Sequence, residues 1–339
     1  MNILFDTLEP SSMSQEMRAA WEEAARASEL SDPLSNELDW VLSYHAVHGR
    51  NRPVLLLFEH GNLVCLAEEH LPNGSVLLAP LEASWLYNRP LLGPDPLPLF
   101  FRAVDLIEQH YGRASFPTII LGGMWPNQAL SNEILLNLGH VFSFFLYGEG
   151  TQASASLEGG IDGYLSRRSA NFRAKLKKAV RRAKEAGIRY ERVKPANLPD
   201  ALATYERMLK VEKNSWKGKS ENGLLHPLST PFYRELLTSA TLGGRARIIF
   251  ARREEIDVGF IFGIVAHNIY RGQQFSYDLD LKALSLGNTL QYEELLWLTE
   301  EGVLRYDMGP ASGEKMAYKL HWTELTFPLQ SWILRYHAN

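Results

Sequence analysis

A small-residue turn at Ser285, Leu286, Gly287 and Asn288 is the most suggestive chemical feature of the sequence. It lies in the stretch LDLKALSLGNTLQYEEL, residues 279–295, between alternating apolar and charged positions and a helix-like pattern. Phosphate-binding loops occupy such places, but this turn has neither the lysine of a P-loop nor the further glycines of a dinucleotide fingerprint. Its role therefore depends on the elements around it.

A second stretch, residues 166–185, is strongly basic. It holds nine Lys or Arg against one Glu, a net charge of +8, so the rest of a chain of net charge −4 carries −12. One interpretation is a contact with phosphate or another anionic substrate, RNA included. The interpretation we favour is a solvated helix face whose apolar stripe, Phe172, Leu176, Val180 and Ala183, packs on the core. The net negative charge of the rest of the chain and the lack of a known nucleic-acid-binding motif argue against nucleic acid as the main partner.

The spacing of histidine and cysteine does not support metal or thiol chemistry. The closest of the ten histidines, His45 and His48, have no carboxylate or cysteine at a recognised metal spacing, so we expect no metal. The single cysteine, Cys65, excludes an intramolecular disulfide and fits a reducing compartment. Because it sits in the apolar run NLVCLA, we interpret it as a packing residue and not as a nucleophile paired with a distant histidine.

The composition is typical of a folded chain of two domains. With 339 residues, 45% apolar and 22% charged, the sequence resembles ordinary globular proteins. The most apolar runs, at 54–58 and 259–266, are far shorter than the roughly 20 residues that cross a bilayer. The N-terminus has an acid where a secretory signal would have bases. We therefore expect a cytoplasmic protein without membrane insertion.

In the first half, predicted strands alternate with helices. The predicted helices span residues 14–29 and 98–112. The predicted strands are PVLLLFEHG, NLVCLAEEH, SVLLAPLE, TIILGG and HVFSFFLYGEG, which ends at residue 150. The small, polar, glycine-rich stretch 148–160 is the predicted boundary, with domains 1–155 and 156–339 on either side.

The second half opens with the basic helix, which Gly187 ends. The helices predicted here span residues 166–186, 198–216 and 231–240. Three strand-like runs between 245 and 280 indicate an antiparallel meander, and the turn at Ser285 and its helix follow. A strand at 303–309, a short helix in GEKMAYKLHW and two final strands complete the order.

This second half resembles the double-domain GNAT-like acyltransferases of the cellulose-biosynthesis-type acetyltransferase family, relatives of the Fem-type peptidoglycan aminoacyltransferases. The stretches that carry the resemblance are SRRSANFRAKLKKAVRRAKEAG, SWKG at 215–218, FSYDLDLKALSLGNTLQ at 275–291 and LRYDMGPASGEKMAYKLHW at 304–322. The first half is more loosely similar to the degenerate partner domain of such proteins. The resemblance implies an α/β (α+β) fold of two tandem GNAT-like domains, each with its own mixed, mostly antiparallel sheet flanked by helices.

The resemblance also assigns the turn a role. In GNAT domains a helix after the central strand holds the pyrophosphate of coenzyme A with its free N–H groups. The implied cofactor-binding residues are Phe275, Ser276, Tyr277, Lys282, Ser285, Leu286, Gly287, Asn288 and Thr289. Asn288 and Thr289 stand where the usual pattern has a second glycine, in agreement with the Ser-x-Gly version of the double-domain family. The alternative is an ordinary strand-to-helix turn with Ser285 as the N-cap. The implied donor is acetyl-CoA or a longer acyl-CoA, without a metal.

Transfer of an acyl group to an amine requires a neutral amine, a stabilised carbonyl oxygen and a proton for the departing thiolate. Asp278 and Asp307 are the candidate general bases, although either could be a structural carboxylate that satisfies loop amides. Tyr318 falls where many GNAT enzymes carry the tyrosine that protonates the thiolate; the alternative is a core tyrosine. Candidates for substrate contact are Lys319 and Trp216, the latter alternatively a helix-capping residue.

Three functions remain open at this point. The first is transfer from acyl-CoA, or a thioester on an acyl carrier protein, to the amine of a small molecule, an amino sugar or an envelope or polysaccharide precursor between the two domains. The second is aminoacyl-tRNA-dependent transfer of the Fem type, the one case with nucleic acid as a partner. The long helical hairpin insertion of that group is not found in this sequence. The third is a non-catalytic double-GNAT scaffold.

Overall fold

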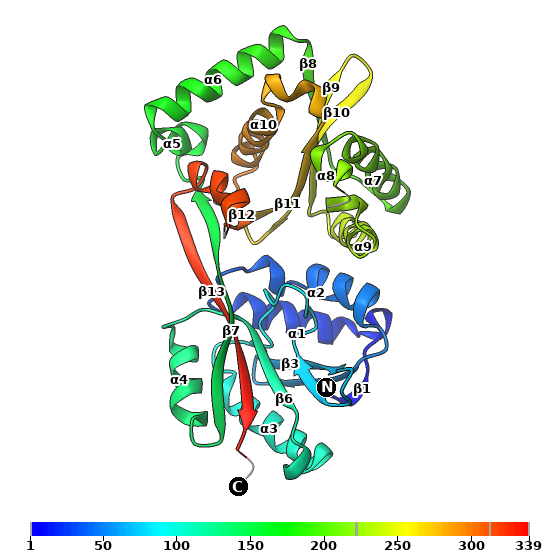
Figure 1. The fold of residues 1–339 in the computed structure, drawn as a ribbon, viewed down its shortest axis with the longest axis vertical. Helices are drawn as coiled ribbons and strands as arrows, with labels where there is room; N and C mark the ends of the chain where they lie inside the picture. Colours follow the sequence, from blue (N-terminus) through cyan, green and yellow to red (C-terminus); the bar gives the residue numbers. More distant parts are fainter. Residues whose placement is uncertain (1, 221–222, 312, 338–339) are drawn as a thin grey trace. The chain divides into compact units, whose positions relative to one another are not determined.

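The computed structural model describes residues 2–220, 223–311 and 313–337, and the chain forms two compact units (Figure 1). Unit 1 consists of Met1–Thr151 and Phe327–Asn339, and unit 2 of Gln152–Thr326. The C-terminal segment thus belongs with the first unit. The predicted division into 1–155 and 156–339 placed this segment in the second domain. Among the described residues, no helix has both the length and the apolar character needed to cross a membrane.

Unit 1 is a mixed sheet with helices. Its strands are β1 (Ile3–Thr7), β2 (Pro53–Glu59), β3 (Asn62–His70), β4 (Val76–Ala79), β5 (Leu91–Leu92), β6 (Thr118–Met124), the first part of β7 (Phe142–Ser156) and most of β13 (Leu325–Tyr336). Its helices are α1 (Gln15–Arg26), α2 (Leu38–Tyr44), α3 (Leu97–Tyr111) and α4 (Ala129–Leu138). The strand order is β1-β2-β3-β4-β6-β13-β7, with β4 and β6 parallel and β1 to β4 antiparallel.

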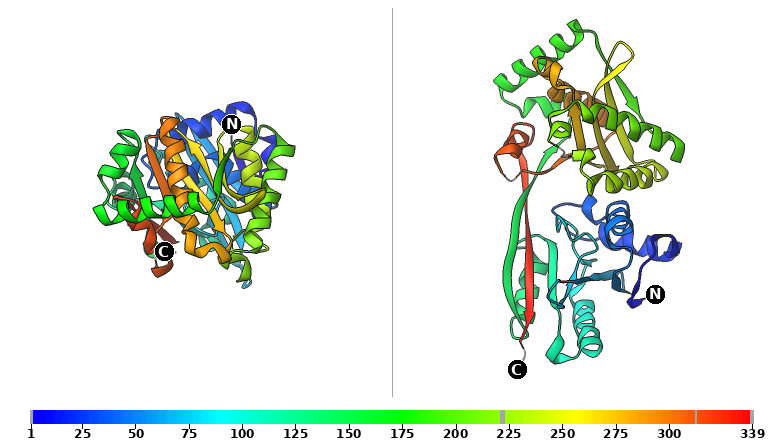
Figure 2. Two further views of the ribbon diagram at one scale, coloured as in Figure 1. Left: turned by 90° about the horizontal axis from the view of Figure 1, so that it is seen from above. Right: turned by 45° about the vertical axis from the view of Figure 1, so that its right-hand side comes forward.

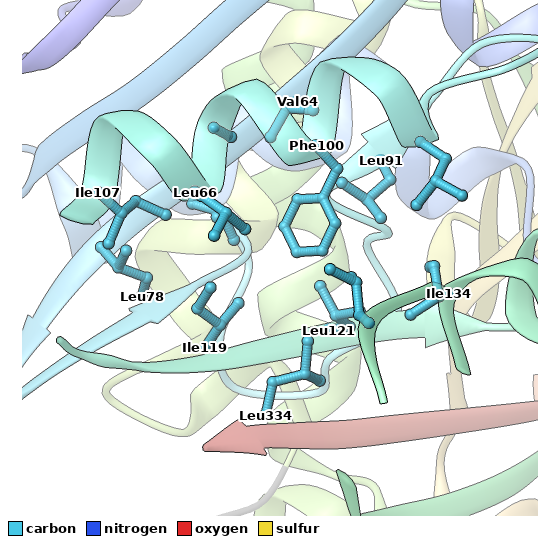
Figure 3. Packing of buried hydrophobic residues seen from close by; sticks show 14 of the residues in the cluster. Val64, Leu66, Leu78, Leu91, Phe100, Ile107, Ile119, Leu121, Ile134 and Leu334 are labelled. Atoms are coloured by element: carbon cyan, nitrogen blue, oxygen red, sulfur yellow. The ribbon is translucent and has the colours of Figure 1, made fainter. Parts of the chain in front are cut away.

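The core of unit 1 lies between α3 and the sheet. Figure 3 shows Phe100 and Ile107 of α3 directed at strand residues such as Leu66 and Leu121, and all four are buried in one apolar cluster. Apolar positions at helical spacing on α3 meet alternating positions on the strands, which is why the sequence pattern predicted both elements. Cys65 is buried in β3, and burial raises the pKa of its thiol, so the predicted packing role is confirmed.

Unit 2 contains the second sheet order, β7-β12-β11-β10-β9-β8. Its strands are the last part of β7, β8 (Ile188–Val193), β9 (Ala246–Arg253), β10 (Ile256–Ala266), β11 (Ile269–Tyr277) and β12 (Arg305–Pro310). Its helices are α5 (Gly160–Ser166), α6 (Ala170–Glu185), α7 (Leu198–Lys213), α8 (Trp216–Lys219), α9 (Ser229–Leu242) and α10 (Leu286–Glu300). α10, with α6 packed against it, lies on one face of this sheet, and α7 and α9 lie on the other (Figures 1 and 2).

The strand pairing of unit 2 confirms the predicted meander. β9, β10 and β11 are antiparallel neighbours, whereas β11 and β12 are parallel because α10 connects them. The apolar residues of this sheet were correctly taken as core: Phe260 and Phe262 of β10 are fully buried. The sheet is therefore mixed and mostly antiparallel, as expected.

The predicted boundary stretch 148–160 contains the division between the units, which lies between Thr151 and Gln152. The stretch is not a loop, however, because β7 continues through it to Ser156 and its small residues Ala153 and Ala155 are fully buried. β7 is also a member of both strand orders, so the two sheets are hydrogen-bonded into one instead of being separate. Small side chains favour loops locally, but they also allow close packing against a sheet, and that second use applies here.

The ends of the basic helix and of the chain also differ from the prediction. α6 begins at Ala170 and not at 166, because the Oγ of Ser169 accepts a hydrogen bond from the Phe172 N–H at 3.1 Å and caps the helix. Its end at Gly187, with φ of +76°, is confirmed. One long strand, β13, stands in place of the two predicted final strands.

Candidate active site

The two central strands of unit 2 separate part-way along their length. β11 and β12 pair only from Ile269 to Arg271, opposite Arg305 to Asp307, although both strands continue further. Paired strands lie roughly 4.8 Å apart, so their divergence opens space within the sheet. A cavity of about 570 Å³ lies there, with Gly272 and Phe275 on one side and Met308 on the other.

A β-bulge shapes the β11 side of this cavity. Phe262 pairs with Gln274 and Gly263 with Gly272, so Gln273 is an extra residue in β11. A bulge takes the extra residue out of the regular ladder of backbone hydrogen bonds. Gln273 lines the cavity, and its buried side-chain nitrogen Nε2 has no hydrogen-bond partner among the described residues. Both features leave polar groups available to a ligand.

The start of α10 forms another wall. The carbonyl oxygen of Ser285 accepts from the N–H of Asn288 at 2.9 Å, which leaves the preceding N–H groups of the first turn without partners inside the helix. Ser285 adopts the left-handed conformation, with φ of +58°, and is the N-cap residue, but its side chain makes no capping bond. The positive end of the helix dipole thus faces a cavity that Lys282 also lines.

The structure brings most of the predicted cofactor-binding residues together and leaves three out. The cavity-lining members are Phe275, Tyr277, Lys282, Ser285, Gly287 and Asn288. The other three, Ser276, Leu286 and Thr289, are buried and do not line the cavity. Gly287 lies in a crowded turn, where little space is left for a side chain. A Cβ atom there would lie 3.1 Å from ring atoms of both Phe275 and Tyr277.

The two candidate bases are engaged elsewhere. Asp278 is the N-cap of the 3₁₀ helix η6 (Leu279–Leu284), where its Oδ1 accepts from the Asp280 N–H at 2.9 Å. Asp307 is buried and accepts hydrogen bonds from the Oγ of Ser154 and, at 2.6 Å, from the Nε of Arg305. Neither aspartate lines the cavity. These contacts fit the structural alternative for both carboxylates.

Tyr318 lies on the 3₁₀ helix η7 (Glu314–His321) and lines the cavity. Its ring is half-buried, with its centroid 6.2 Å from that of Phe275. Burial raises the pKa of its hydroxyl to about 12, so the group is protonated at neutral pH and able to donate a proton or a hydrogen bond.

Lys319 follows Tyr318 and lines the same cavity. Only 8% of its surface is exposed, and its Nζ donates a hydrogen bond to the Pro310 carbonyl oxygen at 2.7 Å. Burial, together with the positive charges of Arg271 and Lys217, lowers the pKa of this ammonium to about 7. It is therefore a cation kept in an unfavourable environment, a frequent property of functional sites.

Lys217 was not selected from the sequence, although it lies in the quoted SWKG segment beside Trp216. Its Nζ donates to the side-chain oxygen of Gln274 at 2.7 Å and to the carbonyl oxygen of Phe275 at 3.0 Å. Burial lowers the pKa of Lys217, and the Glu212 carboxylate partly offsets this. Trp216 also lines the cavity and is 47% exposed, at its rim.

The second and third turns of α10 carry two polar side chains that sequence analysis missed. Gln291 lines the cavity, and its buried Oε1 has no hydrogen-bond partner among the described residues. Glu294 is fully buried one turn later, and neither of its carboxyl oxygens has such a partner. Burial raises the pKa of Glu294 well above its ordinary value, so it is a neutral acid at the base of the helix wall.

The favoured interpretation of the basic segment is confirmed. Leu176, Ala179 and Ala183 of α6 are buried, and its lysines are exposed. Arg168, just before the helix, is the exception: it is buried, pairs with Glu324 and lies with its guanidinium carbon 4.5 Å from the centroid of the Tyr164 ring. Among the described residues, no group of three or more His, Cys, Asp or Glu side chains is placed to hold a metal.

Residues 170–320 match the family model of the acetyltransferase (GNAT) domain. This part of unit 2 is therefore similar to GNAT domains. The divergent strands, the bulge and the start of α10 all lie within the matched range. Curated protein sequences give no significant match.

Solved structures extend the likeness to the whole chain. It is similar to a conserved protein of unknown function from Bacteroides thetaiotaomicron, with a TM-score of 0.65, 12% identity and coverage of 98% of this chain and 100% of that one. For FemX the TM-score is 0.62, with 12% identity over 92% and 95%. For a tandem GNAT protein from the clavulanic acid biosynthesis pathway it is 0.50, with 13% identity over 98% of each chain. At such identities the likeness shows the fold alone, and it confirms the expected tandem GNAT-like fold.

Proposed function

We propose that this protein is an N-acyltransferase, which transfers an acyl group from acyl-CoA or a related thioester to the amine of a small molecule, an amino sugar or an envelope or polysaccharide precursor. One observation carries the proposal. The separation of β11 from β12, the bulge at Gln273 and the start of α10 all meet in one cavity. Such a cavity offers a place for a thioester, polar groups for its carbonyl oxygen and an anion site for its phosphates.

The donor would be held at two points. The first-turn N–H groups of α10 and the ammonium of Lys282 suit a pyrophosphate, because both provide positive charge at the cavity wall. The thioester carbonyl oxygen would lie at the bulge, where polar groups outside the strand ladder stabilise the charge that develops during attack. An acyl group on the phosphopantetheine of an acyl carrier protein would use the same carbonyl site.

The chemistry needs no covalent enzyme intermediate. The amine nitrogen attacks the thioester carbonyl carbon, the new C–N bond forms and the C–S bond breaks. Tyr318 gives its proton to the departing thiolate and recovers one from the amine or from solvent. No described cavity-lining residue is a carboxylate, so we propose that the amine binds in its neutral form, and Asp278 and Asp307 take no part.

The Fem-type alternative rests on the likeness to FemX, which shows the fold and not the donor. The longest described helices of unit 2, α6 and α7, have 16 residues each, which is short for a helical hairpin that would contact tRNA. The scaffold alternative does not account for buried polar atoms of Gln273 and Gln291 that lie without partners at a cavity. We therefore favour the thioester donor.

A binding titration separates these functions. Acetyl-CoA, longer acyl-CoAs, free CoA and charged tRNA would each be titrated by calorimetry. We expect acyl-CoA to bind, and binding to weaken about tenfold in Lys282→Ala, because one cation contact is lost. Lys184→Ala, which removes an exposed base of α6 away from the cavity, is the matched control. Binding of charged tRNA without acyl-CoA would establish the Fem-type alternative, and binding of neither would favour the scaffold.

A further inference from the structure

We propose that the acceptor amine carries an anionic group, a carboxylate or a phosphate, which binds between Lys217 and Lys319 in the cavity of unit 2. This inference rests on the proposed function, because it concerns the second substrate of the same cavity. It names the class of acceptor: an amino acid, a peptide terminus or a phosphorylated amino sugar, as opposed to a neutral or purely cationic amine.

The contacts of the two lysines leave their charges poorly compensated. Lys319 donates to a backbone carbonyl, that of Pro310, and Lys217 donates to a side-chain amide oxygen and a second backbone carbonyl. All three acceptors are neutral. The carboxylate of Glu212 raises the pKa of Lys217, but it is itself bound by the N–H of Leu224 at 2.9 Å.

One further polar group of the cavity also suits an anion. The buried Nε2 of Gln273 is a hydrogen-bond donor without a partner among the described residues. Two ammonium groups and one amide donor together complement the oxygens of a carboxylate or a phosphate. They would repel an ammonium ion, and a neutral ligand would leave both charges unpaired.

The cost of this arrangement supports a binding role. Lys319 is nearly fully buried, and Arg271 and Lys217 are close enough to lower its pKa further than burial alone does. Like charges kept together at low exposure destabilise a fold. Such costs concentrate at binding sites, where a ligand of opposite charge removes them.

The site differs from the proposed pyrophosphate site. Lys282 and the start of α10 provide the positive charge there, whereas Lys217 and Lys319 lie against Gln274, Phe275 and Pro310. Lys282 is not among the described groups that influence the pKa of Lys319. One cavity thus has two cationic regions, which fits a donor and an acceptor that are each negatively charged.

A turnover experiment tests the inference with matched acceptors. Thiol release from acetyl-CoA and octanoyl-CoA would be measured with amino acids against their carboxamides, and with glucosamine 6-phosphate against glucosamine. We expect the anionic member of each active pair to have a kcat/KM about ten- to a hundredfold higher. Equal or faster turnover of the neutral member would overturn the inference and leave the acyltransferase proposal in place.

A second measurement does not depend on finding the acceptor. With CoA present to fill the donor site, acetate and inorganic phosphate would be added separately, and the rise in Tm recorded. We expect one of the two anions to raise the Tm of the wild type, and this rise to be lost in Lys217→Met/Lys319→Met, kept in Lys217→Arg/Lys319→Arg and kept in the surface control Lys184→Met. The anion that raises the Tm shows whether the anionic group of the acceptor amine is a carboxylate or a phosphate.

Two outcomes of the second measurement separate the proposals. If neither anion raises the Tm, or if the double methionine variant responds like the wild type, the anionic acceptor site is refuted. If CoA itself fails to stabilise the protein while an anion does so through the two lysines, the donor proposal fails and the anion site remains.

Discussion

The Nζ of Lys319 donates a hydrogen bond to the carbonyl oxygen of Pro310, at 2.7 Å, where β12 ends. This contact holds the ammonium in the cavity formed by the divergence of β12 from β11. A lysine attached to a strand end in this way cannot extend its head group to solvent, as long lysine side chains usually do. The position of its charge is therefore set by the backbone of the sheet.

The first prediction concerns stability and pH. The folded-state pKa of Lys319 is about 7, below its ordinary value of 10.5, so the native state loses this proton first as pH rises. The loss of folding stability caused by this buried charge is largest below pH 7, and it disappears as the pH rises from 7 to 10.5. Lys319→Met should therefore be more stable than the wild type at pH 6, by on the order of a few kcal/mol, and the difference should shrink at pH 9. Urea unfolding at both pH values measures this, with Lys184→Met as the control; a constant difference would contradict it.

The second prediction concerns Gly287. A valine there would contact the rings of Phe275 and Tyr277 and fill part of the space before the first-turn N–H groups of α10. Gly287→Val should abolish acyl-CoA binding in a calorimetric titration and lower stability by roughly 1–3 kcal/mol. Ala283→Val, at an exposed position of η6, should change neither quantity. Unchanged acyl-CoA affinity in Gly287→Val would show that the turn is only a connector.

The third prediction concerns Tyr318. If its hydroxyl protonates the thiolate, Tyr318→Phe should keep the affinity for acyl-CoA while kcat falls by roughly 10²- to 10⁴-fold. Binding and rate must be measured separately, with the acceptor and a saturating donor. Wild-type turnover would remove the tyrosine from the mechanism and leave departure of an unprotonated thiolate as the simpler account.

The fourth prediction concerns the two aspartates. Asp307→Asn should lower stability, because the contact of the buried Asp307 with Arg305 loses its negative charge, and Asp278→Asn should weaken the cap of η6 by about 1 kcal/mol or less. Both variants should keep the rising limb of the pH–rate profile. Loss of that limb in either variant would restore the aspartate as the general base.

The fifth prediction concerns Glu294. Its folded-state pKa lies above that of the unfolded chain, so the unfolded state loses the proton first, and stability falls as pH rises above about 4.5. Glu294→Gln removes the titrating group, and its unfolding free energy should fall less between pH 5 and 8 than that of the wild type. Chemical denaturation across this range measures both slopes. Identical slopes would show that Glu294 does not remain neutral.

Local patterns were sufficient wherever the signal lay within one element. The spacing of apolar residues predicted α3 and α6, and Gly187 marked the end of α6, because helix periodicity and left-handed termination depend on neighbours in the chain. The turn at Ser285 and the tyrosine and lysine at 318–319 were selected from sequence alone, and all three line the cavity.

Signals that depend on pairing between strands could not be found in this way. The extra residue Gln273 is defined only by the register of β11 against β10. The end of β7 resembles a loop in composition, and its Ala155 is buried only because residues distant in the chain, such as Tyr164 and Leu176, pack in the same cluster. The local sequence pattern of β13 likewise does not indicate that this strand belongs to unit 1.

The sequence by itself predicted the tandem GNAT-like fold, and it selected the turn at Ser285 and Tyr318 as candidate site residues, because the signals for these are patterns of residues close together in the chain. The tertiary structure alone showed that Asp278 and Asp307 make structural contacts, and that Lys217, 102 positions before Lys319, lies at the same cavity. The physical reason is that desolvation and charge–charge interaction depend on distance in space. The cationic character of the cavity around Lys217 and Lys319 therefore arises only when β11, β12 and their flanking helices have packed together.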